Sequence, residues 1–203
     1  MKTMSFSPPR LILASSSVYR KAMLQRLGLP FETFSPDLDE SPLPGETPAA
    51  LSQRLALAKA QHIARQHPGA LVIGCDQVAT HDGQPIGKPG SYEGALVQLQ
   101  ELSGKEVQFH SALALTDGER QVVVDVITRC IFRDLTDDEI AHYLTIEKPF
   151  DTAGSAKAEG LGISLMAAMH SDDPTAIIGL PLIELCRQLR SYGVNPTLQA
   201  HVL

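Results

Sequence analysis

Tryptophan is absent from the 203-residue chain, and aromatic residues make up only 5% of it. The three cysteines, Cys75, Cys130 and Cys186, are far apart and form no C-x-x-C pair, which argues against a disulfide framework or a zinc cluster. No apolar run approaches the length that crosses a membrane, and residues 1–10 lack the apolar core of a signal peptide. We therefore expect a cytoplasmic protein with no membrane partner.

A net positive charge and the common nucleotide-binding motifs are also missing. The net charge of −6 argues against nucleic acid as a partner. The sequence has no G-x-G-x-x-G and no G-x-x-x-x-G-K-[ST], so it predicts neither a Rossmann dinucleotide site nor a P-loop. None of the seven histidines stands in an H-E-x-x-H motif, and we expect them to be structural or surface residues.

The overall composition is that of a globular protein, with 43% apolar and 20% charged residues. The chain is long enough to bury a core, and it contains no internal repeat and no obvious linker. We expect a single domain over residues 1–203, with residues 1–9 and about 197–203 at its periphery.

The stretch that begins at Leu11–Ala14 suggests how an anion could be bound. The four apolar residues predict a buried strand, Ser15–Ser17 offer a helix N-cap, and Gly28 would stop that helix. A helix N-terminus attracts anions, and Arg20 and Lys21 in its first turn make the place suited to a phosphate. An ordinary capped strand–helix turn with two solvated bases is the alternative.

Helices and strands alternate in the first half of the chain, which predicts a mixed α/β fold. Further strands are expected over residues 31–34, 70–75, 107–115, 122–132 and 161–166. Further helices are expected to begin at Thr47, Ser91, Thr136 and near Pro181. The turn signals Asp82-Gly83 and Thr116-Asp117-Gly118 predict hairpins.

Polar residues recur at predicted strand ends and loop edges: Arg20, Glu40, Lys59, Asp76, Gln77, Lys88, Lys157 and Glu159. Ligands of open α/β sheets gather at the carboxyl ends of strands. An acid there can hold a divalent metal or take a proton from water, and nearby bases can neutralise a polyphosphate.

Most of these charged residues also have a structural explanation. Asp76, after its strand, could form a turn. Glu40 and Asp39 could be solvated loop acids, Lys59 could extend along a helix face to solvent, and the charges at 157 and 159 could be ordinary loop charges. The residues alone therefore indicate an α/β protein with an acid and several bases near a phosphate-suited turn.

Eight blocks in order resemble the Maf family of nucleoside triphosphate pyrophosphatases: LILASSSVYRKAML, DLDE, RLALAKA, IGCDQV, GKP, FRDLTDDEI, AGSAKAEGLGI and IIGLPLIELC. The resemblance implies a mixed, elongated, twisted sheet flanked by helices, with two lobes and a central cleft. It implies hydrolysis of a nucleoside triphosphate between the α and β phosphates, with a divalent metal, Mg or Mn, as cofactor. It also implies a homodimer.

The resemblance assigns roles to individual residues. The phosphate-binding positions are Ser15, Arg20, Lys59 and Lys88. Asp76 matches the general base, and Glu40 the acidic-loop carboxylate. Both carboxylates are metal-ligand candidates, and whether Asp76 acts as base, ligand or both stays open.

The segments Asp-Gln-Val at 76–78 and Ser-Ala-Lys-Ala-Glu-Gly at 155–160 resemble the family branch that acts on 7-methyl-GTP. N7-methylation gives the base a positive charge, which an aromatic face attracts, and a carboxylate can accept the donors of the guanine edge. Tyr19, Gln77 and Glu159 stand at the positions that would select the base. The chain departs from the pattern at Val18, where the family usually has Pro, and at Tyr19, where the branch often has Trp.

Two other functions are compatible with the resemblance. One is the same chemistry on another modified or canonical triphosphate, such as dTTP or UTP. The other is a nucleotide-binding regulator of septum formation, the effect for which the family is named. Asp76, Lys59 and Lys88 favour an enzyme, because a pure binder needs no acid that activates water.

Overall fold

The computed structural model describes residues 9–200. Its three short 3₁₀ helices are labelled η. The elements are β1 (Leu11–Ala14), α1 (Val18–Gln25), β2 (Glu32–Phe34), α2 (Pro48–Gln66), β3 (Leu71–His81), β4 (Gln84–Ile86), α3 (Tyr92–Leu102), β5 (Glu106–Thr116), β6 (Gln121–Phe132), α4 (Asp137–Glu147), η1 (Ala153–Ser155), η2 (Leu161–Leu165), β7 (Met166–His170), η3 (Ala176–Ile178), α5 (Leu182–Ser191) and α6 (Pro196–Gln199).

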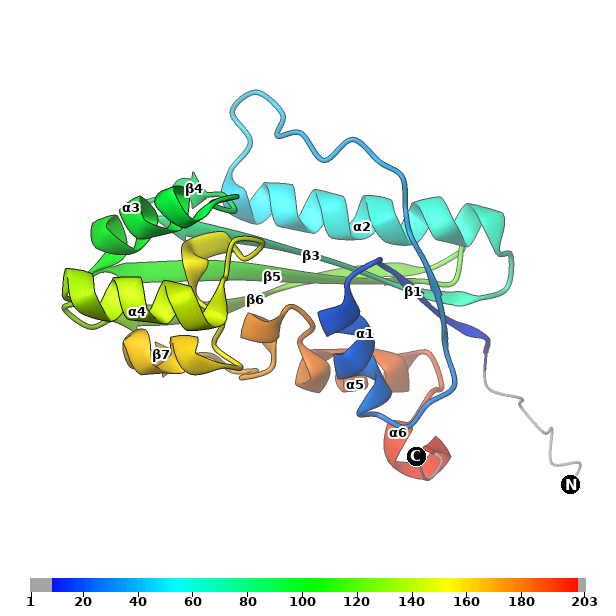
Figure 1. Cartoon of the computed structure of the whole chain (residues 1–203). Helices are drawn as coiled ribbons and strands as arrows, with labels where there is room; N and C mark the ends of the chain where they lie inside the picture. The colour runs from blue at the N-terminus through cyan, green and yellow to red at the C-terminus, as the bar shows by residue number, and fades with distance from the viewer. Residues whose placement is uncertain (1–8, 201–203) are drawn as a thin grey trace, which may run out of the picture.

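The described strands form one seven-stranded sheet in the order β2-β1-β3-β5-β6-β7, with β4 also pairing with β3. β1 is parallel to β2 and β3, whereas the other pairs are antiparallel. The mixed α/β fold is thereby confirmed. The long hairpin of β5 and β6 extends the sheet well beyond β1 and β2 and gives the molecule its elongated form (Figure 1).

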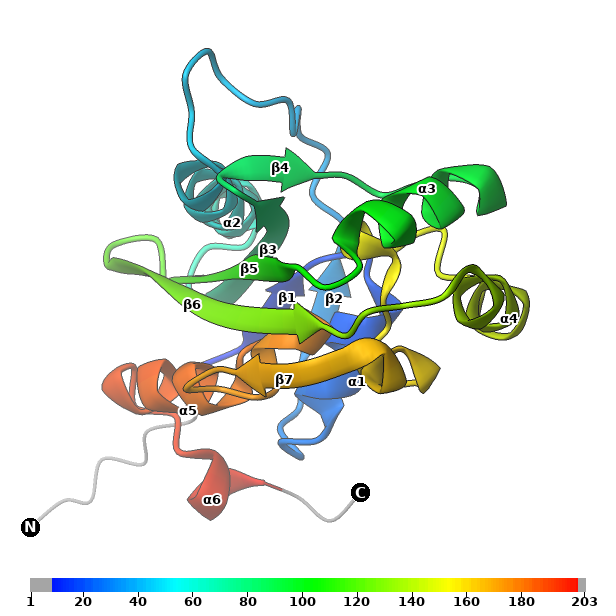
Figure 2. The same cartoon turned by 90° about the vertical axis from the view of Figure 1, so that its left-hand side faces the viewer.

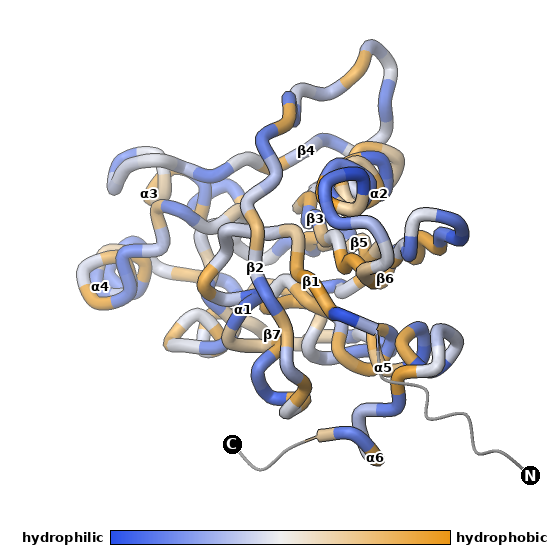
Figure 3. The backbone as a smooth tube through the Cα atoms, turned by 90° about the vertical axis from the view of Figure 1, so that its right-hand side faces the viewer, coloured by the Kyte–Doolittle hydropathy of each residue, from blue (hydrophilic) through white to orange (hydrophobic). Residues whose placement is uncertain are grey.

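Helices cover both faces of the sheet in different places. Helix α2 lies along one face, and α1 and α5 lie against the other. Helices α3 and α4 stand together at the open end of the β5–β6 hairpin, opposite its turn (Figures 1 and 2). Each group has its own buried apolar cluster: one with α1 and α5, one with the alanines of α2, and one with α3 and α4. Hydrophobic residues mark β1 and much of the central sheet (Figure 3). The sheet thus links three groups of helices.

Glycine at position 74 brings α2 unusually close to β3. A Cβ on Gly74 would lie 2.1 Å from the carbonyl oxygen of Ala56 and 2.9 Å from Cβ of Ala60. Side chains two apart on a strand point to the same face, so Asp76 also faces α2. This close approach of α2 to β3 sets the distance that the side chain of Lys59, on α2, has to span to reach Asp76.

Strand β3 does not end at Asp76, contrary to the sequence prediction, but continues to His81. Along one edge, its first residues pair with β1 up to Gly74, and its last residues pair with β4 from Ala79. Residues 75–78 between them pair only with β5 in the described part of the chain. Asp76 is therefore no turn former: it lies inside a strand, at a gap in the sheet edge.

The predicted strand over residues 161–166 is also wrong. Residues Leu161–Leu165 form a 3₁₀ turn, and the strand follows at Met166–His170. Gly162 packs so closely that a Cβ would lie 2.5 Å from the carbonyl oxygen of Lys157. A short apolar run does not distinguish these structures, and tertiary packing decides between them. The short helix Pro196–Gln199 was not predicted.

The other predicted elements are present, with ends shifted by a few residues. The Asp82-Gly83 hairpin joins β3 and β4, and Thr136 with Glu139 forms a capping box. The predicted peripheral ends fall largely on residues 1–8 and 201–203, which lie outside the described residues. Between residues 9 and 200, no helix is both long and apolar enough to span a membrane.

Candidate active site

A cavity of about 700 Å³ opens at the gap in the edge of β3, between the end of β1 and the end of β4. It is lined by all nine site residues expected from the sequence: Ser15, Tyr19, Arg20, Glu40, Lys59, Asp76, Gln77, Lys88 and Glu159. They come from segments spread over 145 positions of the chain, from 15 to 159. The fold therefore brings the predicted residues together, while their chemical roles stay predictions.

The turn after β1 has the predicted helix cap. Ser17 is the N-cap of α1 and its hydroxyl accepts from the backbone N–H of Arg20 at 3.3 Å. Ser15 Oγ accepts from the N–H of Ser17 at 3.1 Å, which orders the turn. Arg20 Nε donates to the carbonyl of Gly179 at 3.0 Å. This contact holds the guanidinium at the cavity wall, and its Nη groups have no hydrogen-bond partner within residues 9–200.

Lys59 and Asp76 form a buried ion pair at the floor of the cavity. Lys59 Nζ lies 2.7 Å from Asp76 Oδ1, and the two residues are only 6% and 7% exposed. The same Nζ lies 2.8 Å from Oε1 of Glu40, whose side chain remains 55% exposed. Lys59 therefore does not extend to solvent, and Glu40 is not simply a solvated loop acid.

The pKa of Asp76 is raised above its ordinary value. Burial is the largest cause, because it disfavours the charged carboxylate. The charge of Lys59 and its hydrogen bond oppose the effect, as does the charge of Arg20. Perturbed carboxyl groups of this kind in a cleft are candidates for proton transfer.

Glu40 and Asp76 have the chemistry for a Mg²⁺ or Mn²⁺ ion shared with substrate. Both carboxylates approach one point, Nζ of Lys59. Magnesium is commonly held by one or two carboxylates together with substrate phosphates and water. Within residues 9–200 no group of three or more His, Cys, Asp or Glu side chains is placed to hold a metal ion. Glu40 and Asp76 are therefore candidate ligands by the chemistry of their side chains, and the metal stays a prediction.

Gln77 points away from Lys59, because neighbouring residues of a strand alternate between faces. Its Nε2 donates to Ser111 Oγ at 2.8 Å and to the carbonyl of Ala176 at 3.0 Å. The amide nitrogen is thus engaged by the protein, and Oε1 has no partner within residues 9–200. If Gln77 selects the base as the sequence suggests, it does so as an acceptor.

The cavity is also lined by an aromatic side chain and by two further acidic ones. Tyr19 is 39% exposed and lines the cavity together with Glu159 and Asp151. Lys157 Nζ lies 3.5 Å from Asp151 Oδ1, and its pKa is raised by that carboxylate and by the neighbouring Tyr19, against burial, the largest and opposing effect. Lys157 therefore lies between the carboxylate of Asp151 and the ring of Tyr19.

Sequence reasoning missed Asp151 as a cavity residue and Ser111 as a partner of Gln77. Ser111 left little signal, because it directly follows His110 and only precedes the apolar run at 112–115. Asp151 left none, since it is one more charge at the start of a loop.

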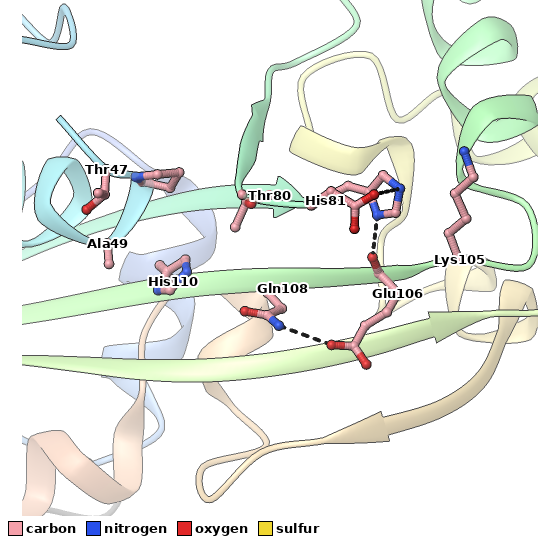
Figure 4. A pocket seen from close by; sticks show the side chains of 11 residues that line it. Thr47, Ala49, Thr80, His81, Lys105, Glu106, Gln108 and His110 are labelled. Carbon is pink, nitrogen blue, oxygen red and sulfur yellow. Dashed lines mark hydrogen bonds and ion pairs between the residues drawn. The ribbon is translucent and has the colours of Figure 1, made fainter. Parts of the chain in front are cut away.

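A second cavity, of about 370 Å³, contains none of the predicted site residues (Figure 4). It lies beside the N-terminus of α2 and includes His81 and His110. His81 Nδ1 is 2.8 Å from the carbonyl of Glu106, and His110 Nδ1 is 2.7 Å from Asp125. Both histidines have structural partners, in line with the sequence prediction.

The fold and the larger cavity define an α/β protein with a mixed sheet and a polar, charge-lined site at the edge of its central strand. A family model described as Maf-like protein matches residues 10–192, and the chain belongs to the Maf family.

Several named proteins are similar to this one over most of the chain. A protein of Bordetella avium named 7-methyl-GTP pyrophosphatase is 66% identical over 188 residues, covering 93% of this chain and 95% of its own. Proteins of the same name from Bordetella pertussis and Burkholderia thailandensis are 61% and 59% identical, covering 93% and 92% of this chain and 95% and 89% of their own.

Proposed function

We propose that this protein hydrolyses 7-methyl-GTP to 7-methyl-GMP and diphosphate. The observation that carries the proposal is the buried pair of Lys59 and Asp76 in a cavity that also contains Arg20 and Lys88. An acid beside several cations suits the hydrolysis of a polyphosphate, since phosphoryl transfer depends mainly on positioning and charge stabilisation. The relatives named 7-methyl-GTP pyrophosphatase support the choice of substrate.

In this mechanism, water attacks the α phosphorus and the bond to the oxygen bridging the α and β phosphates breaks. Asp76 accepts the proton of the attacking water, and diphosphate leaves. Ser15 and the first turn of α1 bind phosphate oxygens through N–H and hydroxyl donors. Arg20, Lys59 and Lys88 neutralise the negative charge that grows on the leaving diphosphate.

A divalent cation, Mg²⁺ or Mn²⁺, completes the proposed site. When bound, it polarises phosphate oxygens and offsets the charge of the leaving group. Glu40 and Asp76 would hold it, and the carboxylate oxygens of both residues already approach Lys59 Nζ within 2.8 Å. Lys59 would then keep the two carboxylates oriented.

The methylated base is placed against Tyr19 and Glu159 in this proposal. The positive charge of 7-methylguanine is attracted to the face of the tyrosine ring. Glu159 accepts hydrogen bonds from the N1 and N2 donors of guanine. Both residues line the cavity, and the exposed ring of Tyr19 is accessible to a ligand.

A nucleotide panel tests the proposal directly. Diphosphate release is measured for 7-methyl-GTP, GTP, dTTP and UTP, each with added magnesium or manganese and with a chelator. We expect the highest kcat/KM for 7-methyl-GTP and loss of turnover with the chelator. Equal or faster turnover of dTTP or UTP would move the assignment to another substrate of the same chemistry. No diphosphate release from any nucleotide would leave a binding function, such as the regulation of septum formation.

A cytoplasmic homodimer completes the proposal. The family resemblance favours the dimer, and the dispersed cysteines favour a reducing compartment. Sedimentation equilibrium at several protein concentrations gives the mass in solution, for which we expect twice that of one chain. A single-chain mass at all concentrations would contradict the dimer.

A further inference from the structure

Ser111 is a fully buried hydroxyl that links the central sheet to the cavity wall without lining the cavity itself. The residue lies on β5 and is 0% exposed. Its Oγ donates to the carbonyl of Ala176 at 2.9 Å and accepts from Nε2 of Gln77 at 2.8 Å. Both hydrogen-bonding capacities of the hydroxyl are therefore used between β3, β5 and η3.

Gln77 reinforces this link. Its Nε2 donates to the carbonyls of Ala176 and Ile177 at 3.0 and 3.3 Å. A carbonyl oxygen can only accept, so the amide must direct its nitrogen toward η3. Ala176 O consequently receives hydrogen bonds from two side chains of the sheet, which fixes the start of η3.

The end of η3 is connected to Arg20. The N–H of Gly179 donates to the carbonyl of Ala176 at 2.9 Å, which closes the short turn. The carbonyl of Gly179 in turn accepts from Nε of Arg20 at 3.0 Å. Gly179 has φ of +110°, a conformation for which glycine is favoured. A continuous set of contacts therefore runs from Ser111 through η3 to the guanidinium.

The segment before and after η3 is anchored independently. Asp173 is 2% exposed, and its Oδ2 accepts from the N–H groups of Ile183 and Glu184 at 2.7 and 3.1 Å. This carboxylate ties the segment to the N-terminus of α5. The flanks of η3 are thus held to each other, while the side chains of Ser111 and Gln77 connect η3 itself to the sheet.

We propose that Ser111 is a positioning residue for Arg20, acting through the carbonyls of Ala176 and Gly179. This inference rests on the proposed function only in taking Arg20 to bind the triphosphate. Without the Ser111 hydroxyl, Ala176 O loses one of its three donors, and the amide of Gln77 loses the nearest of its three acceptors. The turn then shifts, and the guanidinium shifts with it. Displacements of about 1 Å far from the reacting atoms can lower rates by two orders of magnitude.

A double-mutant cycle separates this role from a general loss of stability. The affinity for inorganic tripolyphosphate is measured by calorimetry for wild type, Ser111→Ala, Arg20→Ala and the double variant. We expect Ser111→Ala to weaken binding about fivefold or more, as for one lost hydrogen bond, and to have no further effect when Arg20 is already alanine. Equal effects in both backgrounds, or no effect in either, would overturn the inference.

Thr116→Val is the matched control. Thr116 is another buried hydroxyl on β5, and its Oγ1 donates to the carbonyl of Arg120 at 2.9 Å, away from η3. This variant loses a similar hydrogen bond, but we expect unchanged affinity for tripolyphosphate. If Ser111→Ala does not fold, Ser111→Cys retains a weak donor of similar size, and the same cycle is measured with it.

Steady-state kinetics with 7-methyl-GTP distinguishes the two proposals. If the wild type does not hydrolyse this nucleotide but the tripolyphosphate cycle shows coupling, only the proposed function fails. If it hydrolyses the nucleotide and the cycle is additive, only the role of Ser111 fails. A wild type that does not bind tripolyphosphate overturns the role of Ser111 as well, because Arg20 would then not be a phosphate-binding residue.

Discussion

Lys59 Nζ and Asp76 Oδ1 lie 2.7 Å apart, with both residues almost fully buried. Neither charge is well hydrated there, so each depends on the other. Breaking a buried pair by removing one partner generally leaves an uncompensated charge and costs several kcal/mol. Substitutions that keep the size and polarity of the side chain are therefore the informative ones at this site.

Asp76→Asn is expected to lower kcat for diphosphate release by about 10²–10⁴-fold, the usual contribution of general acid–base catalysis. The amide keeps the shape of the side chain and can still accept a hydrogen bond from Lys59, but it cannot accept a proton from water. Kinetics with 7-methyl-GTP and a circular dichroism spectrum of the variant provide the measurement. A folded variant with turnover within a few-fold of wild type would remove Asp76 from the mechanism.

An ion pair between Glu46, in the loop before α2, and Arg54, in α2, should make the stability of the fold depend on pH. Arg54 donates to both carboxylate oxygens of Glu46, at 2.6 and 2.8 Å, and to the carbonyl of Ser41. The hydrogen bond from Arg54 lowers the pKa of Glu46 from 4.5 to about 2. Because the folded-state pKa is depressed, this stabilisation is present above pH 4.5 and is lost as the pH falls toward 2.

Glu46→Gln should therefore lower the thermal midpoint relative to wild type at pH 6, and the difference should shrink between pH 4.5 and 2. Thermal unfolding in a pH series measures it. In an Arg54→Met background, Glu46→Gln should lose its pH-dependent effect. A difference that stays constant down to pH 2 would contradict the assignment to this pair.

Gly74→Ala is expected to destabilise the fold by about 1–3 kcal/mol or more, the typical cost of overpacking a core. The new Cβ would lie 2.1 Å from the carbonyl oxygen of Ala56, so α2 must move away from β3. That movement also lengthens the reach from Lys59 to Asp76, and we expect lower kcat. Gly87→Ala is the control for stability, because nothing lies within 4 Å of a Cβ there. Equal unfolding free energies for the two variants would contradict the packing argument.

Helices and turns could be predicted from the sequence wherever capping or turn residues mark their ends. Ser17, Thr47, Ser91 and Thr136 each accept the expected backbone N–H at the start of their helices. These contacts depend on residues three positions apart, which is information that a sequence contains. The elements bounded by such signals were accordingly found within a few residues.

The continuation of β3 through Asp76 could not be predicted in this way. Two polar residues after an apolar run normally mark the end of a strand. Here the strand continues, because Lys59 compensates Asp76 and Ser111 receives the amide of Gln77. These partners lie 17 and 34 positions away, so local sequence reasoning does not find them.

The candidate site, too, could be predicted from the sequence only in part. Composition and spacing alone reached an acid and several bases near a phosphate-suited turn, and the family resemblance selected the nine residues that line one cavity. Neither identified the route from Ser111 through η3 to Arg20. That route uses the carbonyls of Ala176 and Gly179, and backbone carbonyls leave no trace in residue identity.

Glu159→Gln tests how the base edge is read. A carboxylate can accept from both donors of the guanine edge, whereas the amide offers one acceptor and a competing donor. We expect kcat/KM for 7-methyl-GTP to fall by the equivalent of about 1–3 kcal/mol. The kcat/KM for UTP, which lacks this pair of donors, serves as the internal reference and should change little. A parallel loss for both nucleotides would assign Glu159 to phosphate or metal binding instead.

Tyr19→Trp tests whether the aromatic ring contacts a charged base. Tyr19 lines the cavity and is 39% exposed, which leaves room for the larger indole. Tryptophan attracts cations more strongly than tyrosine, and a whole cation–π contact at an exposed site is worth about 0.5–1 kcal/mol, so the KM for 7-methyl-GTP should fall, but by no more than a few-fold. GTP carries an uncharged base of nearly the same shape and should gain less, while Tyr19→Leu should weaken 7-methyl-GTP more than GTP. Because stacking alone would improve both nucleotides equally, the ratio of their kcat/KM values isolates the charge of the methylated ring. A ratio that is unchanged in both variants would show that Tyr19 does not distinguish the methylated base.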